Sequence, residues 1–206
     1  MKYIIIIHKN NREYIVDSYP NLIIETDENT KDNIIHIYDT VKFQEKSLFM
    51  LKGIRGNFYF MPNTIFEGVE IRTGPGCFEQ NLIVKNNNYF EKNFEIALTT
   101  DFSSLLIGAN CYFKRNVEIW VGDGHAIINK TNMHALNCNE WNLEISDKVL
   151  IEHNVVLLKK AKIGGGSVVK SNSVITKDFS NSSEVMLEGV PAKIVKENIV
   201  WMRGKE

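Results

Sequence analysis

The clearest pattern in the chain is an aliphatic residue at every sixth position of its C-terminal half. The residues of this series are Ile145, Ile151, Leu157, Ile163, Val169 and Ile175. The position four residues further on holds small or β-branched side chains, which are Val149, Val155, Ala161, Ser167 and Ser173. A strict six-residue period drifts around a helix of about 3.6 residues per turn and leaves no constant apolar stripe. The pattern is typical of a triangular β-helix, in which each six-residue unit makes one short side and one corner.

The six-residue period continues towards the N-terminus, with one interruption. Ile107, Phe113 and Ile119 keep the period, whereas residues 125–144 contain no aliphatic series. We therefore expect residues 125–144 to form a loop that projects from the coil. A weaker series places the start of the coil near residue 53, and its members are Tyr59, Ile65, Ile71, Cys77 and Ile83. The sequence thus predicts an all-β chain with a parallel β-helix over residues 53–188.

The two ends of the chain lack this period. Residues 1–52 alternate apolar runs with polar clusters, which predicts a strand-rich cap on the N-terminal end of the coil. The run of four isoleucines at residues 4–7 is too short to span a membrane, so we expect a buried strand there. Residues 189–206 begin with turn residues and continue with helix-compatible ones. They predict a short C-terminal helix that closes the open end of the coil.

Composition narrows the classes of function. The 206 residues are enough for one domain with a sizeable core. Lys and Arg total 24 against 25 Asp and Glu, so no bulk charge attracts nucleic acid or an acidic membrane surface. The three cysteines, Cys77, Cys111 and Cys138, form no CxxC pair, which argues against a disulfide framework or a structural zinc site. The expected compartment is the cytoplasm.

These six-residue units, followed by residues 174–178 and 189–194, resemble the hexapeptide-repeat acyltransferases over about residues 105–200. Residues 122–127 and the closing residues 196–201 are similar to bacterial surface-polysaccharide O-acetyltransferases, including the polysialic acid O-acetyltransferases. The resemblance implies a left-handed coil and a homotrimer with acetyl-CoA in a groove between neighbouring β-helices. It also implies transfer of the acetyl group to a hydroxyl of a surface sugar or polysaccharide.

His125 is the candidate general base for such a transfer. An imidazole titrates near neutrality, and this one stands where the regular series stops and Gly122 and Gly124 free the backbone. Asp123 either fixes the imidazole tautomer or only caps the turn. These two residues are the predicted catalytic pair.

Other residues are candidates for binding the two substrates. Trp120 and Trp141 can stack on a sugar ring or simply pack, and His134 can meet the acceptor or stand in solvent. The run Gly164, Gly165, Gly166 and Ser167 either leaves the backbone open to the pantetheine arm or is an ordinary turn. The candidate partners of the coenzyme A phosphates are Lys159, Lys170, Lys177 and Lys193.

Two alternatives to the acetyltransferase hypothesis remain. Leu150 stands where the similar proteins usually carry a Trp, and Glu152 and Lys170 stand where they usually carry Gly. These departures motivate a catalytically inactive trimeric scaffold or sugar-binding protein. The other alternative is a metal enzyme like the γ-class carbonic anhydrases, with zinc on His125, His134 and His153, although the spacing does not resemble that family's and no metal is expected. The sequence does not specify the acceptor sugar.

Overall fold

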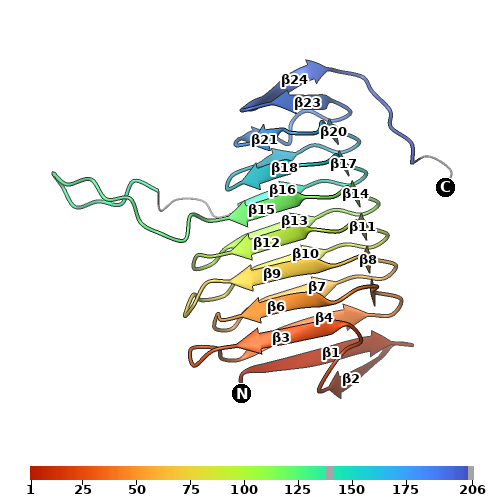
Figure 1. Ribbon diagram of the computed structural model, residues 1–206, viewed down its shortest axis with the longest axis vertical. Coiled ribbons are helices and arrows are strands. Elements are labelled where there is room, and N and C mark those ends of the chain that lie inside the picture. The colour runs from red at the N-terminus through yellow and green to blue at the C-terminus, as the bar shows by residue number, and fades with distance from the viewer. Residues whose placement is uncertain (138–141, 204–206) are drawn as a thin grey trace.

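The computed structural model describes residues 1–137 and 142–203, and the chain winds into a stack of triangular coils (Figure 1). Each full coil contributes one strand to each of three sheets, so strands that follow one another in sequence lie on different sheets. The structure is a left-handed parallel β-helix, as the resemblance implied. The described residues contain no helix at all, and therefore none long and apolar enough to cross a membrane.

Three sheets form the sides of the triangle. In spatial order, the nine-stranded sheet consists of β2 (Arg12–Val16), β1 (Tyr3–Lys9), β4 (Asn33–Tyr38), β7 (Asn57–Phe60), β10 (Asn81–Val84), β13 (Ser104–Ile107), β16 (Asn142–Ile145), β19 (Lys162–Ile163) and β22 (Asp178–Phe179). The eight-stranded sheet consists of β24 (Ala192–Lys196), β23 (Met186–Gly189), β20 (Val168–Val169), β17 (Leu150–Ile151), β14 (Tyr112–Phe113), β11 (Tyr89–Phe90), β8 (Ile65–Phe66) and β5 (Lys42–Phe43). The seven-stranded sheet consists of β21 (Val174–Ile175), β18 (Val155–Leu158), β15 (Val117–Val121), β12 (Phe94–Leu98), β9 (Val69–Thr73), β6 (Ser47–Leu51) and β3 (Leu22–Thr26).

The core is built from columns of side chains that repeat from coil to coil. All six aliphatic residues of the series from Ile145 to Ile175 have no exposed surface, and so do the five small residues beside them. Both columns therefore face the core, as the period predicted. In the N-terminal half the column below the eight-stranded sheet is aromatic, with ring centroids of successive Phe side chains 5.0, 4.6 and 4.5 Å apart. Its members are Phe43, Phe66, Phe90 and Phe113.

The coils of the N-terminal half are longer than the repeat predicts. Ile96 pairs with Ile119, which makes that coil 23 residues long, whereas Ile145 pairs with Ile163 in a coil of 18. The weak series through Tyr59 and Ile83 is therefore wrong, because those two side chains point outward. Buried aromatic and aliphatic residues at alternate positions of each strand fill the core instead, among them Phe58, Phe60, Leu82 and Val84.

The coil also begins earlier than residue 53. Parallel pairing of β3 with β6, β4 with β7 and β5 with β8 makes residues 22–43 the first coil. Polar clusters between these strands are corners of that coil rather than loops of a separate cap. Only the antiparallel pair β1 and β2 caps the N-terminal end, where β1 pairs in parallel with β4.

The predicted C-terminal helix is wrong. Residues 192–196 form strand β24, which turns back at Gly189 (φ +110°) and pairs antiparallel with β23. The last coil exposes a row of unpaired backbone donors and acceptors, and a strand satisfies them where a helix would not. The remaining tail, residues 197–203, runs back along the outside of the coil (Figure 1).

Most corners contain a residue with positive φ, and asparagine fills this position repeatedly. At the first corner, between the nine- and eight-stranded sheets, Asn63, Asn87 and Asn110 have φ values of 57°, 60° and 60°. Their side-chain amides bond to one another along the stack at 3.1 and 3.2 Å. A similar ladder at the second corner, between the eight- and seven-stranded sheets, joins Asn93, Asn116, Asn154 and Asn172. Asparagine tolerates this conformation and uses its side chain to link neighbouring coils.

The register of β18 makes a testable prediction. Leu157 is fully buried, whereas its neighbour Leu158 points outward and is partly exposed. Leu157→Ala should lower the free energy of unfolding by roughly 2–5 kcal/mol, because it leaves a cavity in the core. Leu158→Ala is the matched control and should cost far less in urea denaturation. Equal losses from the two variants would contradict the register.

Candidate functional site

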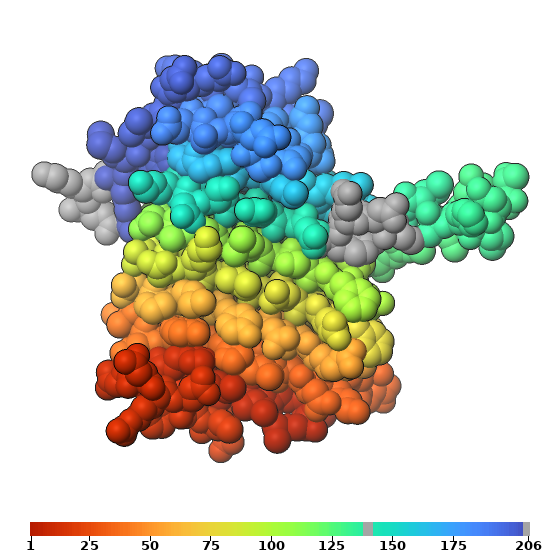
Figure 2. Space-filling view, turned by 180° about the vertical axis from the view of Figure 1, so that it is seen from behind, coloured from red at the N-terminus to blue at the C-terminus, as the bar shows by residue number. Residues whose placement is uncertain are grey.

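A long loop leaves the coil at the third corner, which lies between the seven- and nine-stranded sheets. The regular coil stops at Val121 and resumes at Asn142, so Asn142–Glu144 belong to β16 rather than to the loop. Gly122 starts the exit with φ +130°, and a Cβ there would lie 2.8 Å from Oγ1 of Thr100. Only glycine fits at this point. The loop projects well beyond the body of the molecule (Figures 1 and 2).

One side chain fastens the base of the loop. Asn137 Nδ2 donates to Oδ2 of Asp123 at 2.6 Å and to the carbonyl oxygen of His125 at 2.9 Å. Its Oδ1 accepts from the backbone amide of Ile127 at 2.8 Å. Beyond this point the two arms of the loop form an antiparallel bridge between Ile128 and Ala135. Asn137 thus fixes the backbone on both sides of His125.

Asp123 is held from two directions. Lys159 of the next coil forms an ion pair with its Oδ2, which also accepts from Asn137. Partial burial acts to raise the pKa of Asp123, but the hydrogen bonds from Lys159 and Asn137 outweigh it and lower the pKa below the usual value. Asp123 forms no hydrogen bond to the His125 ring in this structure. It therefore secures the loop to the coil, and its predicted role in fixing the imidazole tautomer stays a prediction.

His125 stands exposed at the mouth of the loop. Within residues 1–137 and 142–203, no hydrogen bond or ion pair involves its ring. The backbone on either side is fixed by Asn137, so the ring is tethered but accessible to a ligand. Such an imidazole can take a proton from a hydroxyl that approaches the third corner.

The other residues that the sequence predicts to bind the acceptor do not gather around His125. Trp120 lies on the outer face of the seven-stranded sheet, half-buried, and its indole donates to Glu118 at 3.0 Å. His134 is exposed towards the outer end of the loop, nine positions beyond His125. Trp141 lies outside the described residues. His153 sits at the second corner, so the three histidines of the zinc alternative are not gathered, and no metal-binding group forms in the described part of the chain.

The glycine run is explained by close packing between coils. A Cβ on Gly164 would lie 2.2 Å from the carbonyl oxygen of Ser182, and Gly166 has φ +69°. Ser167 is fully buried, and its hydroxyl accepts from the amide of Val185 at 3.3 Å. The Ser167 side chain belongs to the inward column of small residues, and the predicted contact between the backbone of this run and coenzyme A stays a prediction. Gly165 and Gly166 are both partly exposed.

The four lysines predicted for coenzyme A fall into two groups. Lys159 and Lys177 lie on successive coils at the third corner, the same corner as His125. Lys177 is exposed, with its ammonium 5.4 Å from the Phe179 ring centroid. Lys170 is at the second corner and pairs with Glu152 at 2.9 Å, while Lys193 is exposed on β24. The geometry brings only the first group to the candidate site.

Sequence reasoning missed Asn137. The loop contains several asparagines, and no periodicity marks the one that folds back onto Asp123 and His125. Its role depends on contacts across 12 and 14 positions of irregular chain, which only the folded loop reveals.

No protein-family model matches the chain. A polysialic acid O-acetyltransferase of Escherichia coli O1:K1 is 33% identical over 124 residues, which are 59% of this chain and 38% of that protein. A galactoside O-acetyltransferase of Escherichia coli K12 is 27% identical over 120 residues, which are 58% of this chain and 56% of that protein. The chain thus spans less than two thirds of the length of these relatives.

Two solved structures match almost the whole chain. A polysialic-acid-specific acetyltransferase superimposes with a TM-score of 0.62 and 22% identity, covering 91% of this chain and 92% of its own. A second polysialic acid O-acetyltransferase gives a TM-score of 0.58 and 26% identity, covering 90% of each chain. The likeness therefore extends to the N-terminal coils, which the weak repeat in the sequence left undefined.

The fastening at the base of the loop is testable. Asn137→Ala should speed hydrogen exchange of the Ile127 amide, because that amide loses its acceptor. Amides of the coil, such as that of Leu157, should exchange as before. Asn132→Ala, which removes an amide nearer the tip of the loop, is the matched control. Unchanged protection of Ile127 in Asn137→Ala would show that this side chain does not hold the loop.

Proposed function

We propose that the chain is an O-acetyltransferase of the hexapeptide-repeat acyltransferase superfamily. It moves an acetyl group from acetyl-CoA to a hydroxyl of a bacterial surface sugar or polysaccharide. The observation that carries the proposal is His125, an exposed imidazole whose backbone is fixed on both sides by Asn137. The names of the relatives, which are O-acetyltransferases of sugars, support the reaction class.

His125 acts as the general base in this proposal. Its free ring nitrogen takes the hydroxyl proton while the acceptor oxygen attacks the acetyl carbonyl carbon of the thioester. The tetrahedral intermediate collapses as the carbon–sulfur bond breaks, and the protonated imidazole returns its proton to the leaving thiolate. The products are an acetyl ester and coenzyme A. Asp123 contributes by anchoring the loop through Lys159, so that the imidazole is positioned before the substrates arrive.

The positive charge at the third corner is complementary to the phosphates of acetyl-CoA. Lys177 is exposed there, on the same side as His125, whereas Lys159 is paired with Asp123. An exposed lysine such as Lys177 suits a phosphate of the coenzyme. Glu152 and Lys170, which replace glycines of the similar proteins, bond to each other at 2.9 Å and so neutralise their charges at the second corner. Because this pair lies at the second corner, it does not crowd acetyl-CoA at the third corner.

In this proposal, the site is completed by a second copy of the chain that packs against it. His125 stands exposed in the single chain, so a ligand beside it would be open to solvent. The loop also exposes apolar side chains without cover, with exposed fractions of 49%, 48%, 71% and 65% for Ile127, Ile128, Met133 and Leu136. A homotrimer in which the loop meets a neighbouring coil supplies both the wall and the cover. We include a cytoplasmic location in the proposal, because acetyl-CoA is an intracellular metabolite.

The base assignment is tested by replacing His125. His125→Ala should lower kcat at least 10²-fold, because general-base catalysis is lost, while the fold and acetyl-CoA binding persist. His134→Ala and His153→Ala are controls that should lose far less. Near-normal turnover by His125→Ala would remove this residue from the mechanism, and binding without turnover by the wild type would favour the inactive scaffold.

The assembly is tested by light scattering. At micromolar concentration the chain should have three times its monomer mass, because exposed apolar loop residues need cover. Replacing Met133 and Leu136 together by Ser should weaken the assembly, since both are more than half exposed in the single chain. A wild-type monomer would argue against a site shared between chains.

A further inference from the structure

Two histidines meet on the outer face of the nine-stranded sheet, at the N-terminal end of the stack (Figure 1). His8 lies on β1 and His36 on β4, and these two strands pair in parallel. Nε2 of His8 lies 2.9 Å from Nδ1 of His36, which is hydrogen-bonding distance. Glu13 of β2 stands opposite His8, and its Oε1 lies 3.5 Å from Nδ1 of His8. A carboxylate and two imidazoles thus link β2, β1 and β4.

Stacking holds both imidazole rings in place. His8 stacks on Tyr38 of β4, with ring centroids 4.1 Å apart and planes 8° apart. His36 stacks on Tyr59 of β7, with ring centroids 4.3 Å apart and planes 1° apart. Neither ring can turn away from the other without losing its stack. The two nitrogens therefore stay face to face.

The contact between the two nitrogens accommodates one hydrogen and not two. An added proton is most favourable on His8, because its Nδ1 then faces the Glu13 carboxylate while its Nε2 donates to His36. In that state His36 accepts at Nδ1 and carries its own hydrogen on Nε2. A second proton would have to bind Nδ1 of His36, where it would face the hydrogen on His8. The pair can therefore take up one proton intact, but the second proton breaks the contact.

The groups around the pair do not favour the second proton. A cavity of about 480 Å³ beside His8 is lined by two cations, Lys9 and Arg12, and by two carboxylates, Glu13 and Asp39. These charges balance, and the elements packed against the rings contribute the phenols of Tyr38 and Tyr59. Burial lowers the pKa of His36, repulsion from His8 lowers it further, and attraction to Glu13 opposes the two.

The cap formed by β1 and β2 covers one edge of the first coil. β4 pairs with β1 on one side and with β7 on the other, and the Asp39 amide donates to the His8 carbonyl oxygen at 2.8 Å. Ile5 of β1 is buried in the core beside Ile35, its partner on β4. Loss of the cap would leave the backbone of β4 unpaired along one edge.

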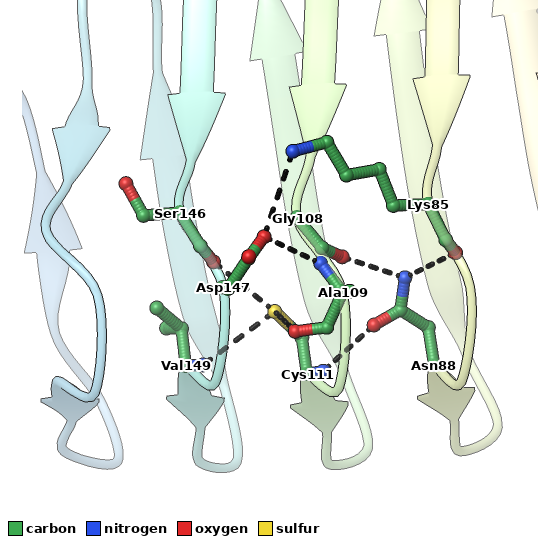
Figure 3. A network of polar contacts seen from close by, with 8 residues as sticks. All are labelled: Lys85, Asn88, Gly108, Ala109, Cys111, Ser146, Asp147 and Val149. Carbon is green, nitrogen blue, oxygen red and sulfur yellow. Dashed lines mark hydrogen bonds and ion pairs between the residues drawn. The ribbon is translucent and has the colours of Figure 1, made fainter.

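The polar contacts in Figure 3, which link three coils at the first corner, involve no histidine. There the Asn88 side chain accepts from the Cys111 amide at 2.7 Å, and the Asp147 carboxylate accepts from the Ala109 amide at 2.8 Å. At the cap, by contrast, β1 and β4 are joined through a histidine pair, whose hydrogen bond depends on the number of protons that the pair carries. The attachment of the cap is therefore sensitive to pH in a way that these corner contacts are not.

We propose that His8 and His36 form a pH-sensitive clasp, which holds the cap on the first coil near neutral pH and releases it in acid. The clasp involves neither acetyl-CoA nor an acceptor sugar, so it stands apart from the proposed function. An imidazole in the released segment titrates near the ordinary pKa of about 6.5. Because the pKa of His36 is lower in the folded cap, the released state binds more protons as the pH falls below that value. Acid therefore favours release, and neutral pH favours the closed clasp.

Hydrogen exchange of the Asp39 amide reports on the clasp, because this amide bonds to the backbone of His8. After correction for the intrinsic effect of pH, the Asp39 amide should exchange about 10-fold faster at about pH 5.5 than at about pH 7.5, the range in which histidine charges. The Leu157 amide, in the coil, should show no such change. His36→Gln can still accept from His8 but takes up no proton, so Asp39 should be equally protected at both pH values. His134→Gln, in the loop, is the matched control and should keep the wild-type response.

A second measurement uses the wild-type chain alone. In nitrogen NMR of the imidazole rings, His36 should titrate with a midpoint below about 6.5, over the same pH range in which Asp39 loses protection. A midpoint at or above that value would overturn the clasp. Wild-type protection of Asp39 that is unchanged by acid, or an equal response in wild type and His36→Gln, would also overturn it. These measurements need no substrate, so their outcome is independent of whether the chain releases thiol from acetyl-CoA.

Discussion

The fold depends on left-handed residues at most of its corners. Short flat strands can follow one another around the triangle only if the chain turns sharply between them. The asparagines at these turns tolerate positive φ and link coil to coil through their side-chain amides, as Asn116 does with Asn93 and Asn154. Because the linked coils stay in register, inward positions form unbroken columns and outward positions form straight rows. This register sets Lys159 and Lys177 on successive coils at the third corner.

The proposed base lies where the chain departs from the coil. The loop leaves at the third corner and carries His125, and the tail returns over the first corner and carries Trp201. Each departure is tied back by a specific polar contact, from Asn137 to Asp123 in the loop and from Trp201 to Lys148 in the tail. The regular coil supplies a rigid frame, and the loop supplies a group that can reach a ligand.

The sequence predicted the C-terminal coils because their period is strict and their columns contain only aliphatic or small residues. It failed for residues 22–52, where coils of 22 or more residues leave no fixed period, as the pairing of Phe49 with Ile71 shows. It also placed Ser167 in the column of small residues, and that side chain is fully buried. Asn137 and the pair of His8 and His36 escaped notice because their roles arise from contacts between distant segments. Helix-compatible residues at 192–196 became a strand because the last coil leaves an open edge to pair with.

The central claim is that this chain transfers the acetyl group of acetyl-CoA to a sugar hydroxyl. The most direct measurement is thiol release from acetyl-CoA by the purified chain with a panel of bacterial surface glycans, with mass spectrometry of the glycan products. The account predicts thiol release that depends on a glycan, and one acetyl ester on that glycan for each thiol released. Thiol release without an acetylated glycan, or no release with any member of the panel from a folded and trimeric chain, would contradict it.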